Sequence, residues 1–117
     1  MAISEPRFNQ HSMCVSAHGH IEKSEVELAF VLAQQEARAN GTPMIVIVDA
    51  NAADFLTAGA RMAFLEAAAL PCIRAILFVA EPTLLQQALR SIQVLDLYGK
   101  IQVYTSAADA KAALATT

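Results

Sequence analysis

The stretch MIVIVDANAADFLTAG, residues 44–59, decides how the rest of this chain is read. Met44 to Val48 is an uninterrupted apolar run rich in β-branched residues, which is typical of a strand buried on both faces of a parallel sheet. The run stops at Asp49, a polar loop over 50–56 is expected to follow, and Thr57 or a neighbour then begins a helix. In an open α/β sheet, ligands and partners bind where strand ends lead into helices, so this segment predicts the position of the functional site.

The segments on either side repeat this alternation of strand and helix. Period-two patterns and short apolar runs indicate strands, and apolar stripes bounded by caps, Gly and Pro indicate helices. The predicted strands cover 8–17, 44–50, 73–80 and 101–104, and the predicted helices cover 24–40, 57–70, 82–94 and 106–115. This order predicts an α/β fold with a largely parallel sheet, in which the first strands can pair antiparallel at one edge.

Length and composition bound the class of protein. The 117 residues form a single domain, with residues 1–6 expected as a loose terminus, and 56% of them are hydrophobic but only 6% aromatic. The net charge of −3, without a Lys/Arg cluster, argues against nucleic acid as a partner. No apolar run approaches the roughly 18–20 residues of a membrane span, and no signal peptide is recognisable. We therefore predict a cytoplasmic protein whose Cys14 and Cys72 are buried thiols.

The order of four segments of this chain matches the order of elements in a known family of domains. Ala17-His18-Gly19 leads into a helix, and three longer segments follow it in the order of the family's elements. These are MIVIVDANAADFLTAGARMAFLEAA, IRAILFVAEPTLLQQAL and LYGKIQVYTSAADAKAAL. The pattern, over about residues 12–115, resembles the STAS domain of bacterial anti-sigma-factor antagonists and sulfate-transporter tails, and the related STAS/SEC14-like small bacterial proteins. The resemblance implies a STAS-like (SpoIIAA-like) sandwich with a mixed four- or five-stranded sheet and about four helices.

The regulatory position of that family is altered in this chain. Members of the antagonist type carry Asp-Ser-Ser/Thr-Gly where this chain has Leu56-Thr57-Ala58-Gly59. The family's phosphorylated hydroxyl immediately precedes the Gly, and Ala58 has no oxygen there. Thr57, one position earlier, is the alternative phospho-acceptor, although a Thr at this place more commonly caps its helix.

Other polar residues have a functional and a structural interpretation. His18 and His20 could bind a metal with His11 or Glu22, or they could form a polar turn, and we predict no metal site. Asp49 and Asp54 could serve acid–base chemistry, but an Asp at a strand end more often orders the following loop by accepting backbone N–H groups. The structural interpretation is the commoner one, and we predict no catalytic residue and no cofactor.

Small and hydroxyl residues also mark the predicted strand-to-helix turns on one edge of the sheet. Together they could hold an anion or a phosphorylated partner, or each hydroxyl could cap its own helix. The residues concerned are Thr57, Gly59, Thr83, Thr105 and Ser106.

The sequence therefore predicts a regulatory protein–protein interaction module that is not an enzyme. Its partner would be an anti-sigma factor or another regulator, and a homodimer stays open. The contacts would lie in loop 50–56 and on the helix from 57 to 70, where Glu66 is a further candidate. The predicted partner-binding residues are Asp49, Asn51, Asp54, Thr57, Ala58, Gly59 and Arg61. The alternative is a small-molecule or lipid-binding STAS/SEC14-like module with an apolar pocket between sheet and helices.

Overall fold

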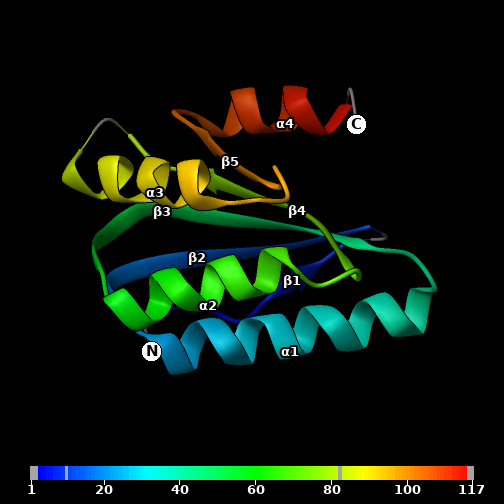
Figure 1. The fold of residues 1–117 in the computed structure, drawn as a ribbon. Coiled ribbons are helices and arrows are strands. Elements are labelled where there is room, and N and C mark those ends of the chain that lie inside the picture. The colour runs from blue at the N-terminus through cyan, green and yellow to red at the C-terminus, as the bar shows by residue number, and fades with distance from the viewer. Residues whose placement is uncertain (1–2, 10, 82, 116–117) are drawn as a thin grey trace.

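The computed structural model describes residues 3–9, 11–81 and 83–115, and Figure 1 shows a sheet with helices packed against it. The strands are β1 (Arg7–Phe8), β2 (Ser12–Ile21), β3 (Met44–Leu56), β4 (Ile73–Val79) and β5 (Ile101–Tyr104). The helices are α1 (Lys23–Asn40), α2 (Ala58–Ala68), α3 (Leu84–Leu95) and α4 (Ala107–Ala115). The strand order is β1-β2-β3-β4-β5, with β1 antiparallel to β2 and the other pairs parallel. The predicted α/β class and mixed sheet are confirmed.

The helices are divided unequally between the two faces of the sheet. The strands β2 to β5 follow each other in spatial order, and α1, α2 and α3, which connect them, share one core with one face of the sheet. This is the arrangement that successive crossovers of the same, usually right-handed, sense produce. The last helix, α4, lies apart from α1 and α2 in Figure 1 and packs on the other face. There its Leu114 lines a cavity together with Ile45 of β3 and Leu77 of β4.

The main core lies between the sheet and α1, α2 and α3. Three aromatic rings form its centre, with Phe64 of α2 edge-on to Phe30 of α1 at 5.9 Å and to Phe78 of β4 at 4.8 Å between ring centroids. Alanines fill much of the contact between α1 and α2, which lets the two helices approach closely. At their amino ends, a Cβ on Gly59 would stand 3.1 Å from the Cβ of Lys23. Gly59 is therefore a packing residue between α1 and α2.

Two expectations about the strands were wrong. Residues 50–56 form the last part of β3, not a loop, and 18–20 belong to β2, not to a turn. The two segments pair in parallel up to Ile21 and Leu56. Two register shifts interrupt this pairing, and Gly19 adopts a φ of 64°. The irregular register breaks the alternation that would have marked a strand in the sequence.

The amino terminus and the cysteines also differ from expectation. Ile3 lies in the core and bridges to Ala17, so the part of residues 1–6 that the structure describes is not loose, and residues 1–2 lie outside it. Cys14 and Cys72 are free thiols, and both are half-buried, not fully buried. Within the described residues, no helix combines the length and apolar character that crossing a bilayer requires.

Candidate docking surface

The end of β3 projects beyond its neighbour in the sheet. Pairing with β4 stops at Asp49, opposite Val79, whereas pairing with β2 continues to Leu56. Among the described residues, no strand therefore covers residues 50–56 on the side away from β2. The predicted functional segment is a ribbon with one strand edge open, and such an edge is a template for binding an extended chain.

A hollow of about 310 Å³ lies beside this open edge. Asn51 and Asp54 line it from β3, and Glu81, Thr83 and Leu84 line it from the turn that leads into α3. We call it the acidic hollow, because it holds two carboxylates and no described Lys or Arg lines it. Leu84 is 83% exposed and gives it an apolar rim.

Hydrogen bonds fix the geometry of the hollow. The Asn51 side chain accepts a hydrogen bond from the backbone N–H of Glu81 at 2.9 Å, which ties β3 to the turn after β4. The backbone N–H of Asn51 in turn donates to Asp49 Oδ1 at 3.1 Å. Asp49 thus accepts a backbone N–H group as the structural interpretation expects, but that group belongs to β3 and not to a loop. The Asp49 side chain lines a cavity on the α4 face.

Exposed side chains on the other side of the ribbon complete the surface. Asp54 Oδ1 lies 3.6 Å from His20 Nε2, and both side chains are mostly exposed. The ring of Phe55 is 50% exposed and packs at 5.2 Å from the His20 ring. Sequence reasoning missed Phe55 and His20 as partners, because it treated their two segments as separate turns.

The first turn of α2 continues the surface beyond the ribbon. Thr57 is its N-cap, and its Oγ1 accepts a hydrogen bond from the backbone N–H of Ala60 at 3.1 Å and donates one to Ile21 O at 3.0 Å. Ala58 and Arg61 are exposed, whereas Gly59 is half-buried against Lys23. The structure thus places Asn51 and Asp54 in one hollow, and Ala58 and Arg61 in the first turn of the helix that follows. The side chain of Asp49 lies on the α4 face.

The remaining hydroxyls of the predicted edge each serve their own helix. Thr83 Oγ1 accepts from the backbone N–H of Gln86 at 3.3 Å, and Ser106 Oγ accepts from that of Asp109 at 3.2 Å. Because each of these two hydroxyls caps its own helix, the capping interpretation is supported over a shared anion site. No group of three or more His, Cys, Asp or Glu in the described part of the chain could hold a metal ion.

Comparison with known proteins supports the fold through structure alone. No family model and no curated protein matches the chain. Solved structures do match, among them the following two. An anti-sigma factor antagonist from Mycobacterium paratuberculosis is 19% identical with a TM-score of 0.68, and the match covers 97% of this chain and 94% of that one. An uncharacterized protein of the DUF3478 family with a SpoIIAA-like fold, from Shewanella loihica, is 18% identical with a TM-score of 0.65, covering 97% and 92%.

The chain has a SpoIIAA-like fold. The SpoIIAA-like sandwich that the order of segments implied is therefore confirmed as the fold. At this identity the likeness carries the fold and not the residues of a site.

Proposed function

We propose that this STAS-like domain is a regulatory module that binds a protein partner through its docking surface and performs no catalysis. The docking surface consists of residues 50–56 of β3, the acidic hollow and the first turn of α2. The open strand edge beside the hollow carries the proposal, because no described strand pairs with this edge and exposed apolar and charged side chains lie next to it. The structural likeness to an anti-sigma factor antagonist supports a regulatory role.

The chemistry of the surface indicates what kind of partner fits. Asp54 and Glu81 place negative charge in the hollow, and the exposed Leu84 gives it an apolar rim. An extended partner segment with a basic side chain next to an apolar one would complement both features.

In our proposal, this domain is not regulated by phosphorylation in the way that antagonist-type STAS domains are. Ala58 offers no hydroxyl, and the Thr57 hydroxyl makes two hydrogen bonds that hold α2 to β2. A phosphate on Thr57 would break its donation to Ile21 O and strain the cap. Incubation with host lysate and ATP, followed by mass spectrometry, should give no phosphorylated Thr57 peptide. Reproducible phosphorylation would contradict this part of the proposal.

Two charge reversals test the docking surface. Asp54→Arg and Arg61→Glu change exposed side chains at its two ends, and both variants should fold as the wild type. Immobilised wild-type protein should retain a specific partner from host lysate, and each reversal should lose it. Arg38→Glu, an exposed change in the last turn of α1, is the matched control and should retain the partner. Equal retention by all three variants would place the binding surface elsewhere.

Gly59→Trp is not a clean test of this surface. Its side chain would enter the contact with Lys23 and separate the amino ends of α1 and α2. Loss of binding in that variant would report altered packing as well as altered contact.

A second candidate function, binding of a small molecule, is favoured by one observation. The thinly covered α4 face of the sheet holds two cavities, of about 320 Å³ and about 250 Å³. Native mass spectrometry of the purified protein should then reveal a bound small molecule. A mass equal to that of the polypeptide alone would count against this function.

A further inference from the structure

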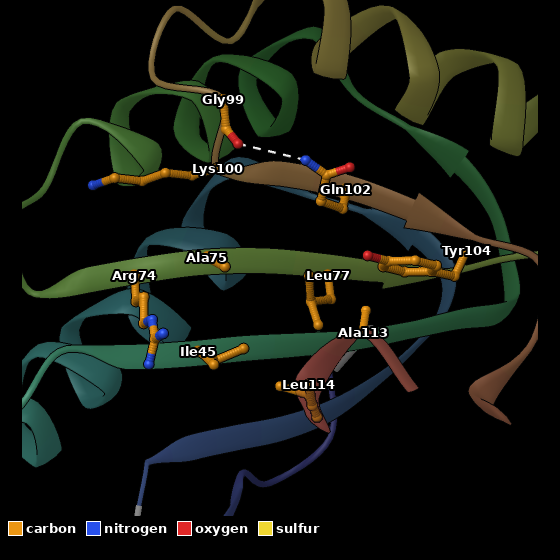
Figure 2. A pocket seen from close by; sticks show the side chains of 10 residues that line it. All are labelled: Ile45, Arg74, Ala75, Leu77, Gly99, Lys100, Gln102, Tyr104, Ala113 and Leu114. Carbon is orange, nitrogen blue, oxygen red and sulfur yellow. Dashed lines mark hydrogen bonds between the residues drawn. The ribbon is translucent and has the colours of Figure 1, made fainter. Parts of the chain in front are cut away.

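The larger cavity on the α4 face has a charged end and an apolar end. Arg74, at the start of β4, and Lys100, immediately before β5, line it where these two parallel strands begin. Ile45, Leu77 and Leu114 line its apolar part, with the ring of Tyr104 at the end of β5. Figure 2 shows the charged groups of Arg74 and Lys100 on the left, extending in different directions, with Ala113 and Leu114 of α4 near the centre and Tyr104 on the right.

The charge of this cavity is opposite to that of the chain. It has two cationic side chains in its lining and no carboxylate from the described residues, whereas the whole chain has a net charge of −3. Lys100 is held in place, because its Nζ donates to Leu70 O at 3.0 Å and lies 5.7 Å from the centre of the Tyr98 ring. Arg74 makes no side-chain hydrogen bond or ion pair with any described residue. Its guanidinium is therefore available to an anion.

The rest of the lining requires an apolar ligand body. Ile45 and Leu77 form a buried floor, and half-buried Ala75 lies beside them. A volume of about 320 Å³ is at the lower end of the roughly 300–1,000 Å³ of ligand pockets. Inorganic phosphate would leave this floor uncovered, and a long lipid would exceed the volume.

The other hollows of the molecule fit an organic anion less well. The smaller cavity on the α4 face has Asp49 in its lining together with Arg7 and Lys111. The acidic hollow has two carboxylates and no described cation, so it would repel an anion.

We propose that the cavity between the sheet and α4 binds a small organic carboxylate with an apolar body. The carboxylate lies at the Arg74 and Lys100 end, where a guanidinium can bind it through two hydrogen bonds. The apolar body lies on Ile45 and Leu77 beneath Leu114. The inference names the ligand class of the second candidate function and rests on it, and it is independent of the docking surface.

Calorimetric titration with sodium octanoate, and with 1-octanol as an uncharged probe of equal chain length, tests the assignment. Octanoate should bind saturably with one site, and octanol should bind about tenfold or more weakly, because it lacks the charge-assisted hydrogen bonds. Arg74→Gln should weaken octanoate about tenfold and leave octanol unchanged. Arg38→Gln, at an exposed arginine in the last turn of α1, is the matched control and should bind octanoate as the wild type.

A blocking variant gives an independent readout. Ala75→Phe places a ring on the cavity floor and should abolish binding of both probes, with circular dichroism confirming the fold. The inference is overturned if octanoate shows no saturable binding, if both probes bind equally, or if Arg74→Gln and Arg38→Gln behave alike. A native mass spectrum with a bound molecule but no octanoate binding would keep the second candidate function and reject the carboxylate. Loss of partner binding in Asp54→Arg has no bearing on this result.

Discussion

The two faces of the sheet are covered to different degrees. On one face, three helices cover strands whose inward side chains are almost inaccessible. On the other face, a single nine-residue helix leaves some of the strand side chains partly exposed. Val46 and Phe78 point to the first face and are 1% and 0% exposed, whereas Ile47 and Ala75 on the second face are half-buried. The difference follows from the size of α4 and from its alanines, which reach less far than the Phe side chains of α1 and α2. Stability is concentrated on the three-helix face, and space for a ligand remains on the other.

The largest effect is expected at the centre of the three-helix face. Phe64→Ala removes the ring that joins α1, α2 and β4 and should cost about 3–5 kcal/mol of unfolding free energy. Since small domains are stable by only about 5–15 kcal/mol, the urea midpoint should fall steeply. Phe55→Ala, which removes a half-exposed ring, is the matched control and should change little. Equal losses in both variants would refute the placement of the core.

A smaller loss is expected from the same kind of truncation on the α4 face. Leu77→Ala should cost about 2 kcal/mol, at the low end of buried Leu truncations, because an existing cavity already borders the side chain. Leu89→Ala on α3, where the residue is 0% exposed, should cost more, toward the upper part of that range. The comparison uses urea denaturation of both variants side by side. If Leu77→Ala were the more damaging change, the α4 face would be the better packed one.

The next largest loss of unfolding free energy is expected from removing the N-cap of α2. Thr57→Ala removes a bond to Ala60 N–H and a bond to Ile21 O and should cost about 1–2 kcal/mol. Thr57→Ser keeps both groups and should recover most of the loss in thermal unfolding. Thr83→Ala removes one longer bond at an exposed site and should cost about 1 kcal/mol or less. If Thr57→Ala were as stable as the wild type, the Thr57 hydroxyl would not be needed for capping and would be free for another use, including phosphorylation.

The sequence predicted the elements of this fold because its patterns were local. An apolar run at 44–48, helices bounded by Gly41 and Pro43, and capping Thr residues each depend on near neighbours in the chain. The predicted loop at 50–56 failed for the opposite reason. Its strand conformation depends on pairing with 18–21, about thirty residues earlier, and the register shifts conceal the period-two pattern.

The sequence predicted that a strand ends near Asp49, but not which side chains gather at that end. Asp49, Asn51 and Asp54 lie near the strand end as expected, yet Asp49 faces the α4 side and the other two face the acidic hollow. Glu81 and Leu84 reach that hollow from the turn after β4. The sequence placed this turn on the same edge of the sheet, but it could not show which of its side chains meet those of β3. The charge pattern of the α4 cavity was equally hidden, because Arg74 and Lys100 come together only through the pairing of β4 with β5.

The smallest expected effect concerns the exposed pair between Asp54 and His20. Both side chains are mostly exposed at 3.6 Å, so solvent screens their attraction, and Asp54→Ala should change the unfolding free energy by less than about 0.5 kcal/mol. Urea denaturation of wild type and variant at equal ionic strength measures the difference. A near-zero value lets a binding defect at this position be attributed to lost contact with the partner. A loss of 1 kcal/mol or more would mean that the projecting ribbon depends on this pair, and the docking surface would then have to be tested at Arg61 instead.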